Sequence, residues 1–129
     1  MRDKEVAVVL DNVRSAENVG SIFRTAEAAG ASKLFLCGIT PAPLDVLGRP
    51  RSRLKKTALG AENFLPWEAC KNTPSLLDRL KNAGFLIFAV EQAKNSLPYV
   101  TASSIIKKQF KKGDKQKIAL ILGNEIKGV

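Results

Sequence analysis

The chain is 129 residues long, carries 21 Lys and Arg against 12 Asp and Glu for a formal charge of +9, and contains two cysteines but no histidine. Its length, with 45% hydrophobic and 26% charged residues, predicts one globular domain, residues 1–129. The absence of histidine excludes histidine nucleophiles and bases, and the absence of a secretory signal or of an apolar run of about 18 residues argues against a membrane partner.

The first third of the chain predicts a strand, a helix and a second strand. Residues 6–10 are continuously apolar and mostly β-branched, which is typical of a strand buried on both faces of a parallel sheet. The polar residues 11–17 predict a loop. From residue 18 onward apolar side chains recur with a helical period, and Gly30 is placed to end that helix. Residues 33–39 predict the second strand.

The rest of the chain is less regular. Residues 40–74 contain Pro, Gly and basic side chains with little periodicity, and they receive no assignment. Residues 75–84 predict a helix with Ser75 as its N-cap and Gly84 as its stop. Two further strands are predicted, at residues 85–91 and 117–123.

This alternation of strands and helices predicts an α/β domain with a mostly parallel sheet flanked by helices. In such sheets, ligands lie beyond the carboxyl ends of the strands. We therefore expect a functional site among three loops, at residues 11–20, 91–97 and 123–128.

The first candidate motif is NVGSIFR, residues 18–24. Gly20 and Arg24 are four residues apart and lie nearly above one another on the predicted helix. Gly20 leaves room for a ligand or a second backbone, and Asn18 can cap the helix or offer a donor and an acceptor. Arg24 can reach along the helix toward the strand ends. The alternative is an ordinary capped helix in which Arg24 pairs with Glu27 in solvent.

The second candidate motif is LGNEIKG, residues 122–128, which follows the last predicted strand. Gly123 permits a turn that other residues resist, and Gly128 permits close backbone approach. Asn124 and Glu125 present polar groups between them. The spacing matches neither a dinucleotide-binding loop nor a P-loop. A simple turn at the end of a strand is the alternative.

Basic side chains gather at residues 48–56 and again at residues 107–117. The surplus of positive charge favours a polyanionic partner, and nucleic acid is the first candidate. The first cluster is rich in arginine, whose planar fork suits phosphate, so we predict that it contacts the phosphates of a nucleic acid. Its members are Arg49, Arg51, Arg53, Lys55 and Lys56. Solvated loops are the alternative, above all for the second cluster.

The two cysteines, Cys37 and Cys70, stand alone in the sequence without CxxC spacing. They indicate reduced thiols, and with them a cytoplasmic protein. Two separated cysteines cannot complete a zinc site in a chain without histidine, so no metal is predicted.

Three segments taken together resemble the SpoU (TrmH-like) branch of the SPOUT RNA methyltransferases: LDNVRSAENVGSIFRTAEAAGA, KTALGAENFLPW and ALILGNEIKGV. The resemblance covers residues 6–129. Residues 18–24 match the family's first motif through Asn18, Gly20 and Arg24, and residues 57–62 resemble a less strict segment. The second motif is matched by Gly123, Asn124, Glu125 and Gly128.

The resemblance implies a ribose 2′-O-methyltransferase that uses S-adenosylmethionine on tRNA or rRNA and usually forms a homodimer. Its fold would be an α/β sheet with a C-terminal trefoil knot. Asn18 and Arg24 would lie at the reacting ribose. The cofactor pocket would be shaped by Gly123, Asn124, Glu125 and Gly128. The family's third motif, which supplies much of the knot and of the cofactor site, is not present in residues 1–129, so we expect an incomplete knot and a domain that lacks its C-terminal part.

The missing third motif leaves a second hypothesis open, that of a catalytically inactive RNA-binding protein on a methyltransferase fold. A nucleotide-binding α/β module without a role in RNA is a third. The charge of +9 and the joint occurrence of the motifs disfavour this last reading.

Overall fold

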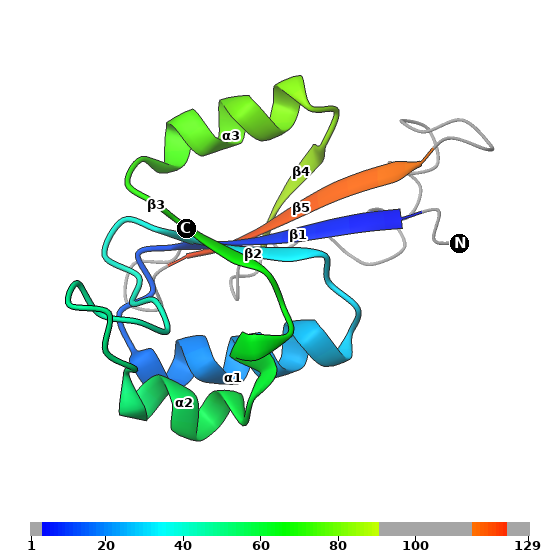
Figure 1. Ribbon diagram of the computed structural model, residues 1–129. Helices are drawn as coiled ribbons and strands as arrows, with labels where there is room; N and C mark the ends of the chain where they lie inside the picture. Colours follow the sequence, from blue (N-terminus) through cyan, green and yellow to red (C-terminus); the bar gives the residue numbers. More distant parts are fainter. Residues whose placement is uncertain (1–3, 91–114, 124–129) are drawn as a thin grey trace.

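The structure is a computed structural model and describes residues 4–90 and 115–123 (Figure 1). Its elements in chain order are β1 (Lys4–Asp11), α1 (Ala16–Ala28), β2 (Lys33–Cys37), α2 (Ser52–Ala58), the 3₁₀ turn η1 (Ala61–Asn63), β3 (Trp67–Cys70), α3 (Thr73–Asn82), β4 (Leu86–Val90) and β5 (Gln116–Gly123). Within these ranges, no helix is long and apolar enough to cross a membrane.

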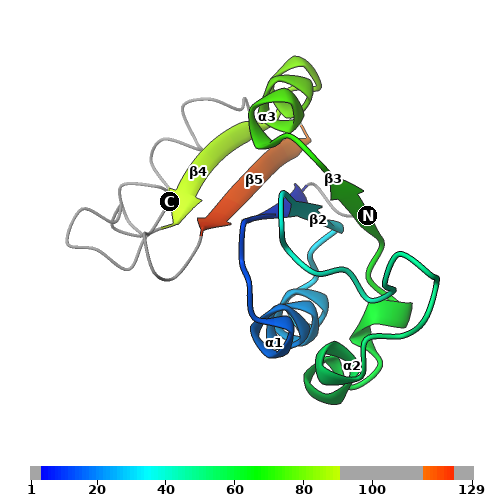
Figure 2. The same cartoon turned by 90° about the vertical axis from the view of Figure 1, so that its left-hand side faces the viewer.

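The five strands form one sheet in the order β3-β2-β1-β5-β4, and every neighbouring pair is parallel. Helices α1 and α2 cover one face of the sheet and α3 lies on the other, as both views show (Figures 1 and 2). The predicted α/β class with a mostly parallel sheet is therefore confirmed. The trefoil knot expected from the resemblance concerns chain beyond Gly123, outside the described residues.

The sheet is buried on both faces because its central strand β1 is apolar at every inward position. Val8 and Leu10 face α1 and pack with its Val19 and Phe23. The alternate side chains face α3, where Val9 belongs to a second apolar cluster. That cluster comprises Ala7, Val9, Phe35, Cys37, Leu76, Leu80, Ala119 and Ile121. A strand between two helical layers needs this continuous apolar pattern, which is why β1 could be predicted.

Helix α1 begins earlier than its apolar period indicates. The Ser15 hydroxyl accepts a hydrogen bond from the backbone N–H of Asn18 at 3.1 Å and so caps the helix, which starts at Ala16. The predicted loop at residues 11–17 is therefore too long at both ends, because β1 also includes Asp11. Gly30 follows the helix with a φ of 84°, which confirms that the helix ends before it.

Helix α3 corrects one predicted cap. The side chain of Asn72 accepts a hydrogen bond from the backbone N–H of Ser75 at 2.9 Å, so Asn72 is the N-cap and the helix begins at Thr73. Ser75 lies inside the first turn, and its predicted capping role is wrong. The prediction failed because Pro74 was read as part of the irregular stretch, whereas proline is well tolerated in the first turn of a helix.

The unassigned residues 40–74 contain α2, η1 and β3 as well as the start of α3. Helix α2 has seven residues and buries only Leu54 and Ala58, so it is too short to show a helical period. Strand β3 has four residues at the edge of the sheet and none of them is fully buried. Both elements depend on tertiary contacts that the local sequence does not signal.

Candidate functional site

The carboxyl ends of neighbouring strands are aligned at one edge of the sheet. Asp11, the last residue of β1, is paired in register with Gly123 of β5 on one side and with Cys37 of β2 on the other. Cys37 is paired in turn with Cys70 of β3. The loop that follows β1 leads directly into α1. The structure thus brings the start of the second predicted motif beside the chain that carries the first, at the edge where α/β sheets bind ligands.

Of the four predicted cofactor residues in the second motif, only Gly123 belongs to the described residues. It ends β5, is half-buried, and has no side chain to occupy the space at the strand end. The other predicted cofactor residues, Asn124, Glu125 and Gly128, lie outside the described residues, as does the predicted loop at 91–97.

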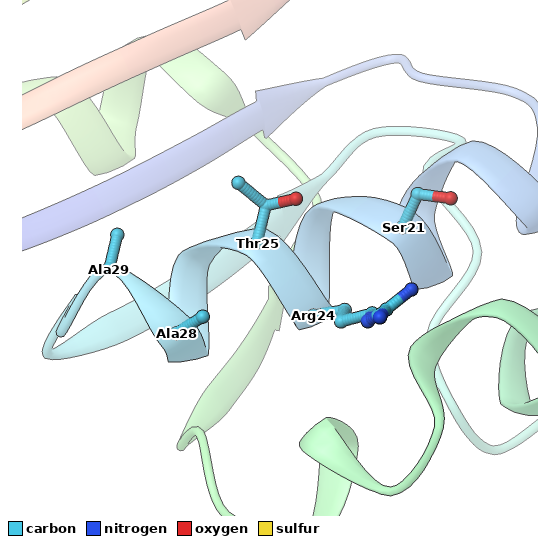
Figure 3. Close-up of a pocket in the computed structure, with 5 residues that line it drawn as sticks. All are labelled: Ser21, Arg24, Thr25, Ala28 and Ala29. Carbon is cyan, nitrogen blue, oxygen red and sulfur yellow. The ribbon is translucent and has the colours of Figure 1, made fainter.

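Asn18 and Arg24 are both exposed on α1. They are six residues apart, a distance of about 9 Å along the helix axis. The Arg24 side chain runs along the helix toward its N-terminal turn, as Figure 3 shows, and it lines a shallow hollow with Ser21, Thr25, Ala28 and Ala29. Arg24 therefore reaches back toward the end of α1 that lies at the carboxyl edge of the sheet.

The alternative in which Arg24 is neutralised by Glu27 is not realised. Among residues 4–90 and 115–123, no carboxylate forms an ion pair with the Arg24 guanidinium. A guanidinium without a partner carboxylate keeps its hydrogen-bond donors available for an anionic ligand.

Gly20 lies on the buried side of α1, against α2. A Cβ atom added to Gly20 would collide with the Thr57 hydroxyl and with the backbone carbonyl of Leu54. Of the two roles considered for this glycine, the structure supports close approach of a second backbone. Because Gly20 is buried, it cannot contact a ligand directly.

Thr57 begins the segment 57–62 noted in the sequence, and it joins the two helices, a role that the sequence did not indicate. Its hydroxyl donates a hydrogen bond of 2.7 Å to the backbone carbonyl of Glu17, next to Asn18. Gly20 signalled that something must approach α1 closely, but nothing in the sequence showed that the partner was α2. The link fixes the position of α2 against the first turn of α1.

The predicted basic cluster is divided between α2 and the loop before it. Arg53, Lys55 and Lys56 are exposed on α2 and, with Ser52, line a shallow hollow. Arg51 is the N-cap residue of α2 and is half-buried, and no described residue accepts a hydrogen bond from its Nε. Helices α1 and α2, which carry Arg24 and these cations, lie side by side on the same face of the sheet (Figures 1 and 2).

Arg49 is held differently from the rest of the cluster. Its Nε donates to Oδ2 of Asp45 at 3.1 Å, forming an ion pair at the surface. Hydrogen bonds from the Arg49 and Leu47 backbone amides keep the pKa of Asp45 below its usual value. Arg49 therefore carries less free positive charge than the cations of α2.

The thiols at the carboxyl edge are unsuited to nucleophilic chemistry. Burial, with a smaller contribution from Cys70, raises the pKa of Cys37 to about 11, and burial also raises the pKa of Cys70. A protonated thiol is a weak nucleophile and a poor metal ligand. Next to them, Thr73 donates a hydrogen bond of 2.7 Å to Oδ1 of Asp11, which ties the start of α3 to the end of β1.

The family model described as the SpoU rRNA Methylase family matches residues 5–129. An uncharacterized tRNA/rRNA methyltransferase of Borreliella burgdorferi is 30% identical over 128 residues, which are 99% of this chain and 49% of that protein. The 23S rRNA (guanosine-2′-O-)-methyltransferase RlmB of Pseudomonas putida is 31% identical over 80 residues, 62% of this chain and 30% of that protein. The chain thus spans half or less of the length of these curated relatives.

Solved structures of RNA-modifying enzymes also align with this chain. The AdoMet-bound rRNA methyltransferase from Sinorhizobium meliloti aligns with a TM-score of 0.72 at 29% identity, covering 97% of this chain and 41% of that one. The TrmH/SpoU tRNA modifying enzyme of A. aeolicus aligns with a TM-score of 0.67 at 24% identity, covering 99% of this chain and 56% of that one, and supports the fold alone.

Proposed function

This chain belongs to the SpoU rRNA methylase family, whose model matches residues 5–129, and we propose that it serves in the transfer of a methyl group from S-adenosylmethionine to a ribose 2′-hydroxyl of tRNA or rRNA. The observation that carries the proposal is the alignment of Gly123 with Asp11 at the carboxyl edge, next to a helix whose Arg24 has no paired carboxylate among the described residues. The choice of a ribose oxygen is supported by the likeness to a guanosine-2′-O-methyltransferase.

The described part of the edge fits S-adenosylmethionine. Gly123 presents half-buried backbone without a side chain, at the position where ligands of parallel α/β sheets lie. When bound, this cofactor supplies an electrophilic methyl group on a sulfonium. Gly123 would hold it through the backbone, and Asn124, Glu125 and Gly128 are proposed to complete the pocket. The S. meliloti rRNA methyltransferase, which is 29% identical, binds AdoMet.

Arg24 is proposed to act on the ribose. A guanidinium stays protonated in proteins, so it is a poor acceptor for the hydroxyl proton. It can instead stabilise the negative charge that develops on the oxygen, or hold a phosphate that accepts the proton. Asn18, six residues earlier on the same helix, would orient the ribose or the Arg24 side chain. Alignment of the oxygen with the methyl carbon is the main contribution asked of these residues.

The cations of α2 are proposed to bind the RNA backbone. Arg53, Lys55 and Lys56 are exposed on α2, which lies beside the helix that carries Arg24 (Figure 2), so a strand of RNA whose phosphates contact them would also pass close to α1. Phosphate contacts release counterions and supply most of the affinity of such complexes. Arg49 and Arg51 would add contacts from the preceding loop.

Two further proposals concern the oligomeric state and the cellular location. A homodimer is proposed from the resemblance to the family, and light scattering of the purified protein tests it. A cytoplasmic location is proposed because Cys37 and Cys70 are free thiols although they are paired in register on adjacent strands. Thiols so close together remain reduced most readily in a reducing compartment.

The test is incubation of the protein with labelled S-adenosylmethionine and total tRNA or ribosomal RNA, followed by digestion to nucleosides and mass spectrometry. We expect label in 2′-O-methylated nucleosides. Label in base-methylated nucleosides would refute the ribose as acceptor. RNA binding without any label would instead establish the second hypothesis, an RNA-binding protein without activity.

A further inference from the structure

The loop between β2 and α2 contains a braced turn, residues 44–50, which we call the Asp45 loop. Leu44 and Pro50 form an antiparallel bridge at its base. Two backbone hydrogen bonds of 2.9 Å close it, from the N–H of Asp45 to the carbonyl of Arg49 and from the N–H of Gly48 to the carbonyl of Asp45. Gly48 has a φ of 78°, which a residue with a side chain rarely adopts.

The Asp45 carboxylate fills the inside of this loop. Its Oδ1 accepts hydrogen bonds of 2.9 Å from the backbone N–H groups of Leu47 and Arg49, and its Oδ2 accepts from Arg49 Nε. With both carboxylate oxygens engaged, the loop holds one conformation without contact to a partner. Little conformational entropy is then left to lose on binding.

The tip of the Asp45 loop consists of two large apolar side chains. Val46 is 97% exposed and Leu47 is 71% exposed. Single exposed apolar residues are common. Two adjacent ones at the tip of a braced loop form an apolar surface whose burial against a partner would be favourable. The hydrogen bonds to Asp45 hold the backbone in a conformation in which both side chains are exposed.

The charge around the tip indicates what covers it. Residues 38–60 contain five cations, and Asp45 is their only acidic residue. Because Arg49 already neutralises Asp45, the segment presents uncompensated positive charge beside the apolar tip. A second copy of this chain would bring a further formal charge of +9 against it. RNA has the complementary chemistry, since it combines phosphates with flat apolar bases.

The position of the Asp45 loop would allow it to contact an RNA that is bound along α2. It follows β2 at the carboxyl edge of the sheet and leads into α2, on the side where α1 and α2 begin (Figure 1). RNA phosphates bound along α2 would continue past Arg49 to the tip. Apolar side chains that insert beside unstacked bases are a recurrent device of nucleic-acid-binding proteins.

We propose that Val46 and Leu47 form an apolar wedge that packs against an unpaired base of the RNA substrate while the cations of α2 hold the flanking phosphates. This inference rests on the proposed function, because it takes RNA to be the substrate. It goes beyond it by assigning a base contact to a loop that carries none of the predicted site residues at its tip.

The test compares the full chain with the variant Val46→Thr/Leu47→Asn, which keeps side-chain size but removes apolar character. The probes are an RNA stem-loop with 2-aminopurine in its loop and a fully paired RNA duplex of equal length. We expect the variant to bind the stem-loop about tenfold more weakly and to lose the increase in 2-aminopurine fluorescence. Its affinity for the duplex should stay unchanged, because the phosphate contacts remain. Val90→Thr, on the outer strand β4, which is separated from β2 by β1 and β5, is the control for RNA binding and should bind both probes as the wild type does.

Three outcomes would overturn the wedge, and they differ from one another. If the wild type binds the stem-loop and the double variant binds it equally well with the same fluorescence change, the wedge alone is wrong. If the double variant keeps its RNA affinity but shifts the oligomeric state in light scattering, the tip contacts a second copy instead. If the wild type binds neither RNA, the proposed function fails together with the wedge.

Discussion

The Thr57 hydroxyl of α2 donates a hydrogen bond of 2.7 Å to the backbone carbonyl of Glu17 in α1, across 40 residues of sequence. It joins the helix that carries the predicted RNA-binding cations to the first turn of the helix that carries Asn18. We expect Thr57→Val to lower the free energy of unfolding by about 1 kcal/mol, the usual net contribution of such a bond. Urea denaturation measures this. Thr57→Ser keeps the hydroxyl, so its free energy of unfolding should fall clearly less. An equal decrease in both variants would assign the effect to packing instead.

Gly20 gives a second test of the same contact. Alanine normally stabilises a helix by about 1 kcal/mol relative to glycine. Here the added methyl group would collide with the Leu54 carbonyl and the Thr57 hydroxyl, so we expect Gly20→Ala to destabilise the protein by about 1–3 kcal/mol. Ser21→Ala on the exposed side of the same helix is the control, with an expected change within about 0.5 kcal/mol. A melting temperature that rises in Gly20→Ala would contradict the close approach of α1 and α2.

The contact between α1 and α2 also shows which elements could be predicted from the sequence and which could not. The central strand β1 was predictable because burial on both faces leaves a continuous apolar run. Helix α1 was predictable because burial on one face leaves apolar residues with a helical period. Helix α2 was not, because two buried residues in seven leave no period. The partner of Gly20 was invisible for the same reason. For the candidate site, the sequence singled out Arg24 and the basic cluster by residue type and spacing, and their roles stay predictions. The bracing of residues 44–50 by Asp45 could not be predicted, because it depends on hydrogen bonds formed only in the folded loop.

The ion pairs of Glu68 predict how stability depends on pH. Hydrogen bonds from Arg79 and then Lys33 lower the pKa of Glu68 from 4.5 to about 2. A carboxyl group whose pKa is lower in the folded state stabilises the fold above its unfolded pKa and loses that contribution as the pH falls through the folded value. The stability of the wild type relative to Glu68→Gln should therefore be constant above about pH 5 and shrink between about pH 4.5 and 2. Since a third of the side chain is exposed, solvent screening keeps the effect small.

Chemical denaturation of both proteins from pH 7 to pH 2.5 measures this difference. Glu27→Gln, an exposed carboxylate on the other face of the sheet, is the matched control and should show no comparable trend. A difference between wild type and Glu68→Gln that grows on acidification would have the wrong sign and would refute the role given to these ion pairs.

The cations of α2 should govern the salt dependence of RNA binding. Each phosphate contact that is lost lowers the slope of log affinity against log salt by about one. We expect Lys55→Gln/Lys56→Gln to lower the slope by about two and to weaken binding of all RNA sequences alike. Lys81→Gln/Lys71→Gln, exposed outside the α1–α2 layer, removes the same charge and should leave the slope close to the wild-type value. Equal slopes for the two double variants would mean that net charge, rather than α2, attracts the RNA.

Variants of Arg24 test most directly whether the proposed methyl transfer can be separated from RNA binding. Its guanidinium is exposed, lacks a carboxylate partner among the described residues and points back along α1 toward the carboxyl edge, as Figure 3 shows. If it stabilises charge on the attacking oxygen, Arg24→Ala should lower the single-turnover rate of methyl transfer by at least about 10²-fold. RNA affinity should remain near the wild-type value, because most phosphate contacts are proposed to come from α2. Arg24→Lys keeps the charge without the planar fork, so a partial recovery of rate is expected. A wild-type rate in Arg24→Ala would remove Arg24 from the reacting site, whereas a loss of RNA affinity equal to the loss of rate would make it a binding residue only.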